Sequence, residues 1–235
     1  MAWNSAVGGM IAAEAPASER ATFIRKTYLH LGGAVLAFIA VEAALLNSPL
    51  AQPLVQTMLG GRMSWLIVLG AFMLVGWVAD RWARSATSPA MQYLGLGLYV
   101  VAEAIIMLPL LYVAAYFSKD PNIIAKAGVL TGLVFVGLTG TVFLTKRDFS
   151  WLRPALMIAG FAALGLIVVS LIFGFTLGTL FAAVMVVVAA GYILYYTSNV
   201  LHHYPVGSHV AAALALFSSV ALLFWYILRI FMDRR

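Results

Sequence analysis

The sequence predicts an all-α integral membrane protein with seven transmembrane helices, and three observations lead to this fold class. Of the 235 residues, 64% are hydrophobic and only 9% are charged, whereas a soluble globular domain has about a quarter charged residues. The mean hydropathy is +1.01. The apolar residues also occur in long runs, and a helix of about 20 apolar residues crosses the hydrocarbon core of a bilayer.

Six apolar runs predict the seven helices. Five runs predict one helix each, at residues 27–46, 64–79, 90–117, 126–144 and 209–231. The sixth run, at residues 155–196, has no charged residue and as a single helix would be about 63 Å long, twice the thickness of the hydrocarbon core. Its Gly/Thr-rich stretch "GFTLGT", residues 174–179, is therefore expected to separate two helices.

The chain divides into a tail and a membrane domain. Residues 1–26 mix Ala, Gly, Ser, Glu and Pro, and we expect a mobile cytoplasmic tail there, followed by the seven-helix domain at 27–235. Eight Lys and Arg residues lie on the N-terminal side of the bundle, which predicts a cytoplasmic N-terminus. The basic residues at the C-terminus conflict with that orientation: either the C-terminus lies outside, or the last helix does not fully cross. The "GVLTG" at 128–132 predicts close helix packing.

Composition excludes several classes of function. The chain has no cysteine and a net charge of +6, but its basic residues lie in short loops, which is typical of topology signals and not of a nucleic-acid partner. It has no phosphate-binding glycine loop, no HExxH and no GxSxG. We therefore expect no enzymatic activity and no cofactor, and the lipid bilayer as the surroundings.

Ionisable residues inside membrane helices are functional candidates, because burying them costs free energy. Glu103 lies in the middle of a helix, and either it is a titrating, cation-binding group or its neutral carboxyl is bonded to a neighbouring helix. Glu42 is expected near the membrane interface, with its carboxyl reaching water. Asp80 and Arg81 are adjacent at a helix end and indicate helix-end electrostatics, or an Asp80 partner on another helix.

The stretch "GYILYYTSNVLHHYP", residues 191–205, gathers polar side chains at a helix end. The expected polar cluster consists of Tyr195, Tyr196, Thr197, Ser198, Asn199, His202 and His203. Adjacent histidines on a helix point about 100° apart and no cysteine is present, so we expect no metal site. A wet loop or a pH-sensing role is the alternative for the histidines.

Three stretches resemble the bacterial Bax inhibitor/YccA family, also called the transmembrane Bax inhibitor motif family. They are "FLTKRDFSWLRPALMIAG", "ILYYTSNVLHHY" and "EAIIMLPLL", the last with Glu103 and Pro109 of the family pattern but Ala104 and Leu108 in place of its glycines. The resemblance covers residues 20–235. It implies a last helix in the centre, ringed by the other six.

The resemblance also implies one of two functions. Some members are pH-gated calcium leaks, and others regulate a membrane-anchored AAA protease in the stress response. The leak members carry two acids that fall here on Tyr196 and Ser219, which stay neutral. We therefore expect a bacterial inner-membrane protein that modulates membrane homeostasis, as a regulator of an AAA protease; the alternative is a pH-sensitive calcium or cation leak with Glu103 as the titrating group.

Overall fold

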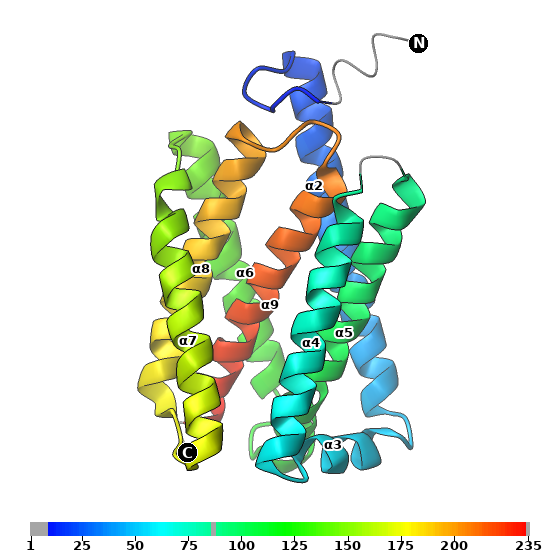
Figure 1. Ribbon diagram of the computed structural model, residues 1–235, viewed down its shortest axis with the longest axis vertical. Coiled ribbons are helices and arrows are strands. Elements are labelled where there is room, and N and C mark those ends of the chain that lie inside the picture. The colour runs from blue at the N-terminus through cyan, green and yellow to red at the C-terminus, as the bar shows by residue number, and fades with distance from the viewer. Residues whose placement is uncertain (1–8, 86–87, 234–235) are drawn as a thin grey trace.

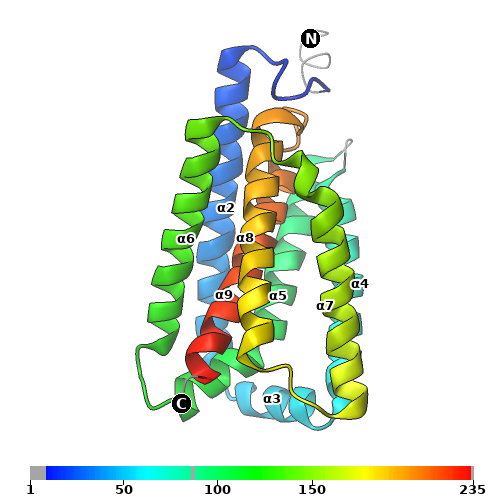
Figure 2. The ribbon, with the colours of Figure 1, turned by 90° about the vertical axis from the view of Figure 1, so that its left-hand side faces the viewer.

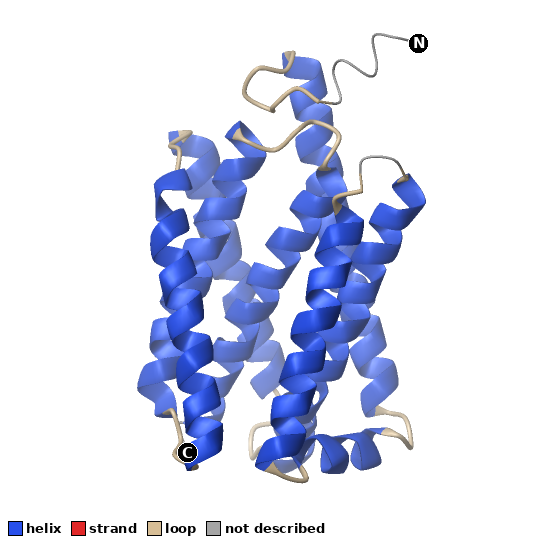
Figure 3. Ribbon diagram, in the orientation of Figure 1, coloured by secondary structure: helices blue, strands red, loops and turns tan. Residues whose placement is uncertain are grey.

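The computed structural model describes residues 9–85 and 88–233, which fold into a bundle of helices (Figures 1 and 3). Seven helices are long and apolar enough to cross a membrane, in agreement with the prediction. The α-helices of the described residues are α2 (Ala17–Leu46), α3 (Ala51–Leu59), α4 (Arg62–Ala83), α5 (Pro89–Phe117), α6 (Ile123–Thr145), α7 (Arg153–Phe173), α8 (Gly178–His202) and α9 (His209–Asp233). A 3₁₀ turn, Ser150–Leu152, precedes α7.

The predicted break in the long apolar run is confirmed. Helix α7 ends at Phe173, and Gly174 adopts a φ of +78°, a left-handed conformation that favours glycine. Helix α8 begins at Gly178, whose φ is +63°. The guanidinium of Arg62, from the start of α4, packs against Gly174 so closely that a Cβ there would collide with it. The connection after α7 is therefore in contact with the start of α4.

Helix α2 begins ten residues before the predicted start of the membrane domain. Residues 10–12 pair with the α8–α9 connection, because Ala12 N donates to Tyr204 O at 2.9 Å and Val206 N donates to Met10 O at 3.0 Å. Ala12 and Phe23 are buried. Residues 17–26, expected to be part of the tail, are helical, and residues 1–8 lie outside the described residues. The mobility of the tail stays a prediction.

Helix α3 was not predicted. It is only 9 residues long and lies across the end of the bundle, between α2 and α4 (Figures 1 and 2). Its buried residues, Ala51, Val55 and Met58, follow helical spacing. The sequence shows this amphipathic pattern, but the segment is too short to cross a membrane.

Helix α9 is the centre of the bundle, as the resemblance implied. It packs against α2, α4, α5, α6 and α8, and small residues at its start, Ala211, Ala212 and Ala213, allow close approach. Helix α5, which carries Glu103, is the other strongly buried helix. The ring around α9 is incomplete at α7, which packs mainly on α8 and α4.

Two further expectations concern packing and topology. The prediction of close helix packing at residues 128–132 is wrong, because a Cβ on Gly128 or Gly132 would meet no atom within 4 Å. The start of α2 and the end of α9 lie at opposite ends of the bundle (Figures 1 and 2). The alternative in which the last helix crosses only partly is therefore wrong, because α9 has 25 residues and runs the length of the bundle.

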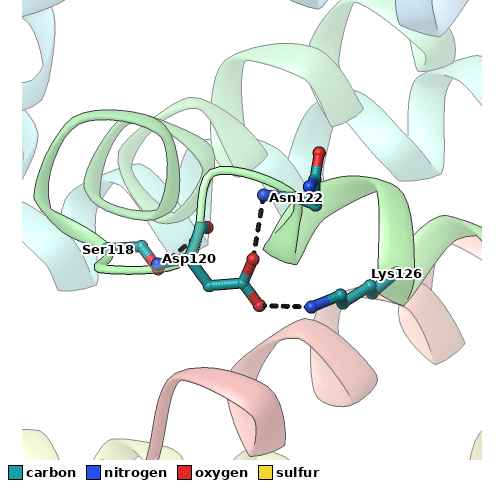
Figure 4. A network of polar contacts seen from close by, with 4 residues as sticks. All are labelled: Ser118, Asp120, Asn122 and Lys126. Atoms are coloured by element: carbon teal, nitrogen blue, oxygen red, sulfur yellow. Dashed lines mark hydrogen bonds and ion pairs between the residues drawn. The ribbon is translucent and has the colours of Figure 1, made fainter.

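The connection between α5 and α6 is ordered by a polar network at the same end of the bundle as α3 (Figures 1 and 4). Asp120 accepts from Lys126 Nζ at 2.8 Å and from the backbone N–H of Asn122 at 3.0 Å. Ser118 Oγ accepts from Asp120 N at 3.2 Å. These bonds satisfy donors around the start of α6, where a tight connection would otherwise leave them unpaired.

Candidate functional site

The candidate site is a cavity of about 1060 Å³ beside Glu103, bounded by α4, α5, α7, α8 and α9. It lies between α7 and α9, which are not packed directly against each other. At one end it reaches Arg62, Arg229 and Asp233, near the end of the chain, and at the other it reaches Tyr196. Glu103 is only 7% exposed and lines this partly open cavity from within the bundle.

A tyrosine hydroxyl lies beside the Glu103 carboxyl. Tyr99, one turn earlier on α5, places its hydroxyl beside this carboxyl, and Ser218 of α9 lies next to the same hydroxyl. A hydroxyl can donate to an ionised carboxyl or accept from a protonated one. Both alternatives left open for Glu103 are thus chemically available: a titrating group facing a cavity, and a carboxyl bonded within the bundle.

Glu42 does not lie at the interface, and that prediction is wrong. Its side chain is only 4% exposed, and both carboxyl oxygens are buried without a hydrogen-bond partner. The reason is its position on the face of α2 that also buries Leu31 and Ala34 and packs against α5 and α9. Glu103 lies within electrostatic range of Glu42, so the bundle holds two neighbouring carboxyl groups.

A second cavity, of about 580 Å³, lies towards the N-terminal end of the bundle. Tyr192 and Tyr196 of α8 line both cavities. Their rings stack at 6.0 Å with an interplanar angle of 15°, and Tyr192 Oη donates to Leu156 O of α7 at 2.9 Å. This tyrosine pair therefore forms a wall shared by the two cavities.

Ser219 borders the larger cavity but its hydroxyl bonds within α9. Ser219 Oγ donates to Ala215 O at 2.8 Å, and Ser218 Oγ donates to the same carbonyl at 2.9 Å. Among the described residues no hydrogen bond joins Tyr196 to Ser219. The two positions that carry acids in the leak members face a common space, but as neutral groups.

The polar end of α8 holds the α6–α7 connection through Asp148. Ser198 Oγ accepts from Phe149 N at 2.8 Å and donates to Asp148 Oδ1 at 3.2 Å, while His203 Nε2 lies 2.9 Å from Asp148 Oδ2. Desolvation acts to raise the pKa of Asp148, but the hydrogen bonds from Ser150 and His203 outweigh it and lower that pKa to about 2. Asp148 is thus an ionised anchor for two segments.

The other members of the expected polar cluster have separate positions. Tyr195 packs against Tyr196 at 5.0 Å. Thr197 Oγ1 and His202 Nε2 are buried without a partner. The backbone carbonyl of Asn199 accepts from His203 N and Tyr204 N, both at 2.8 Å, which ends α8. The residues that are clustered in the sequence therefore have three different positions: some line the cavities, some end α8, and some hold the α6–α7 connection.

Asp80 pairs with Arg84, not with Arg81 and not with another helix. Arg84 Nε donates to both carboxylate oxygens of Asp80, at 2.9 and 2.8 Å. The spacing of four residues brings the two side chains together on α4. The guanidinium of Arg81 instead lies over the Trp77 ring, 5.6 Å from its centroid.

Sequence reasoning missed Asp148, Tyr99, Tyr192 and Arg84. A signal existed for Tyr99 and Arg84, because each lies four residues from an acidic candidate and so on the same helix face. Asp148 lay in a stretch used only for the resemblance. The part of the chain described by the structure brings no three His, Asp or Glu residues together in a way that could hold a metal ion.

These features define a class: a multi-span helical membrane protein whose central helices enclose buried carboxyl groups beside a cavity. The family model for the inhibitor of apoptosis-promoting Bax1 matches residues 20–235. The chain therefore belongs to the Bax inhibitor family.

Relatives of the chain occur in bacteria, plants, animals and viruses. It is 32% identical over 124 residues to an uncharacterised protein of Pseudomonas aeruginosa and 30% identical over 127 residues to a membrane protein of Vibrio cholerae, each match covering 52% of this chain. The chain spans about half the length, 55%, of each of these two bacterial relatives. It is 25% identical to lifeguard 4 of Mus musculus, with 94% of this chain and 89% of that protein covered. A Golgi anti-apoptotic protein of Vaccinia virus is 27% identical, with 94% and 90% covered.

Proposed function

We propose that the protein is a non-enzymatic, pH-sensitive cation leak in the bacterial inner membrane, with Glu103 as its titrating group. The observation that supports this function is the position of Glu103, buried between the central helices yet bordering a cavity of about 1060 Å³. An ionised carboxyl in such a cavity attracts cations, and a protonated one does not. Glu42, within electrostatic range, adds a second negative group when both are ionised.

The charges at the mouth of the cavity favour a slow leak over rapid conduction. Arg62 and Arg229 border the cavity at the C-terminal end of the bundle. Asp233 pairs with Arg229 at 3.5 Å, whereas Arg62 adds positive charge at the entrance and repels cations. The wall formed by Tyr192 and Tyr196 separates this cavity from the second one, so a cation would have to pass that pair of rings to cross.

The test is cation flux with purified full-length protein. We would reconstitute it in liposomes loaded with a calcium-sensitive dye and scan external pH. Flux above that of protein-free liposomes, falling on acidification as Glu103 gains a proton, and lost in Glu103→Gln, is expected. Glu14→Gln is the matched control, because Glu14 is an exposed carboxyl outside the bundle. Equal flux in Glu103→Gln and the native protein would refute the role of Glu103, and no flux at any pH would refute the leak.

A second candidate is regulation of a membrane-anchored AAA protease in membrane homeostasis and the stress response. The observation that favours it is the start of α2, which projects beyond the neighbouring helices at the N-terminal end (Figure 2). A helix end that projects from the bundle offers a surface that a partner protein could bind. Removing residues 1–8 should then weaken co-purification with the protease while leaving liposome flux unchanged.

A further inference from the structure

The second cavity has the chemistry of an anion site. It lies between the end of α4, the start of α7 and the end of α8, and its volume of about 580 Å³ falls within the range of small-molecule sites, about 300–1,000 Å³. Its lining includes Arg84, Arg153, Tyr195, Asn199 and His203. Guanidinium, hydroxyl and amide groups all donate hydrogen bonds to phosphate oxygens.

The two arginines have different roles in this cavity. Asp80 occupies Nε of Arg84, which fixes the guanidinium plane and leaves its terminal nitrogens for other acceptors, Tyr204 among them. Arg153 has no acceptor among the described residues, so its charge is not compensated within the cavity. Two planar guanidinium groups, one held in place and one unpaired, suit bidentate binding of a phosphate.

The surroundings reinforce the positive charge. At this end of the bundle the described residues include eight Lys and Arg and four Asp and Glu. The first residues of α7 line the cavity, and Arg153 is held at this position because the 3₁₀ turn Ser150–Leu152 continues directly into α7. Of the acidic groups, Asp80 and Asp148 are already bonded to Arg84 and His203.

One wall of the cavity is apolar. Leu156 and Met157 of α7 line it, and Met157 is 50% exposed on a helix expected to face lipid. A ligand with a phosphate and an apolar part would therefore be bound better than a bare anion. Figure 1 shows α4 and α7 on either side of α9, and the cavity is lined by residues of α7 and by Arg84, which directly follows α4.

We propose that this cavity binds a phosphate ester, held by Arg84 and Arg153. The ester group is shared by an anionic phospholipid headgroup and a soluble metabolite phosphate, and both fit the same donors. This site does not depend on the proposed leak, because it lies beyond the tyrosine pair from Glu103 and its test measures binding, not flux.

The experiment compares two sources of phosphate with the full-length protein. In detergent, sn-glycerol 3-phosphate is titrated and the dissociation constant is measured by calorimetry. In nanodiscs, the unfolding temperature is compared between phosphatidylcholine alone and phosphatidylcholine with phosphatidylglycerol. The variant is Arg153→Gln, and the control is Arg147→Gln, an exposed arginine of the same end that does not line the cavity.

We expect Arg153→Gln to raise the dissociation constant about tenfold or more, or to abolish the phosphatidylglycerol shift, because one charged hydrogen-bonding group is lost. Arg147→Gln should behave as the native protein does. A response to glycerol phosphate identifies a soluble ligand, and a response in nanodiscs alone identifies a headgroup. No response to either probe, or equal losses in Arg153→Gln and Arg147→Gln, would overturn the site in favour of diffuse charge attraction.

Discussion

At the scale of single residues, Asp148 shows how one carboxylate can hold two segments together outside the membrane. It accepts from Ser198, His203 and the Ser150 N–H, and so joins the α6–α7 connection to the end of α8. Its pKa of about 2 lies below the ordinary value of about 4. Ionised Asp148 therefore stabilises the fold at every pH above about 4.

Asp148→Asn should lower the free energy of unfolding at neutral pH by about 1 kcal/mol or less, since the carboxylate is nearly half exposed and solvent screens it. The folded-state pKa is depressed, so the stabilisation is complete above about pH 4 and is lost as pH falls through about 2. Thermal unfolding in detergent at several pH values measures this difference.

The control for this prediction is Glu14→Gln, which removes an exposed carboxylate at the same end of the molecule. It should leave the unfolding temperature unchanged. If the native protein and Asp148→Asn differed as much near pH 2 as at pH 7, the hydrogen-bonded charge of Asp148 would not be the cause.

Glu42 and Glu103 show what burial does to an acidic side chain. Both carboxyl oxygens of Glu42 are buried without a hydrogen-bond partner among the described residues, whereas Glu103 has the Tyr99 hydroxyl beside it. A buried charge without a partner is costly, and Glu42 has no partner on the neighbouring helices that cover it. The difference in their surroundings makes Glu103, which borders the cavity, the better candidate for ionisation.

At the scale of helices, α4 and α5 approach each other closely at Gly95. A Cβ at this position would lie 2.6 Å from both Ala79 O and Ala83 N. The absence of a side chain lets the two backbones approach, which is a common use of small residues between membrane helices. Gly97, two residues along the same helix, has no atom within 4 Å of the corresponding position.

Gly95→Ala should therefore force α4 away from α5 and lower stability by about 1–3 kcal/mol. Gly97→Ala is the matched control and should be neutral or slightly stabilising, because alanine favours the helix over glycine. The unfolding temperature of each variant in the same detergent measures the effect. A Gly95→Ala variant as stable as Gly97→Ala would mean that the α4–α5 contact is looser than described.

At the scale of the whole molecule, the seven crossings place the start of α2 and the end of α9 at opposite ends (Figure 1). If the N-terminus is cytoplasmic, as the sequence predicts, the end of α9 is expected on the outer side despite the basic residues there. A reporter that is active only in the cytoplasm should therefore be active when fused to the N-terminus and inactive when fused to the C-terminus. The same activity at both ends would contradict seven crossings, and the reverse pattern would contradict the orientation.

The bundle also divides its interior between two cavities, which no single helix determines. The tyrosine pair on α8 separates the two cavities. Residues of α7 line both of them, because α7 packs on α8 and α4 and leaves space between itself and α9. Because both cavities depend on α7 packing on α8 and α4, movement of α7 would change both together. The proposed leak and the proposed phosphate site thus share one structural element.

The sequence by itself determined the number of long apolar helices and the break near Gly174. Hydrophobic length depends only on neighbouring residues, and glycine marks a break through its own backbone freedom. Family resemblance supplied the arrangement around α9. The short helix α3 was not predicted, because an amphipathic pattern of only 9 residues is too short to indicate a membrane-spanning helix.

The tertiary structure alone decided which polar residues meet. Glu42 is buried because α5 and α9 cover its helix face, and Asp148 meets His203 because two loops far apart in sequence lie side by side. The glycines at 128–132 meet no neighbouring helix, while Gly95 does. Side-chain partners depend on how helices rotate and pack against one another, and the sequence of one helix does not contain the position of the next.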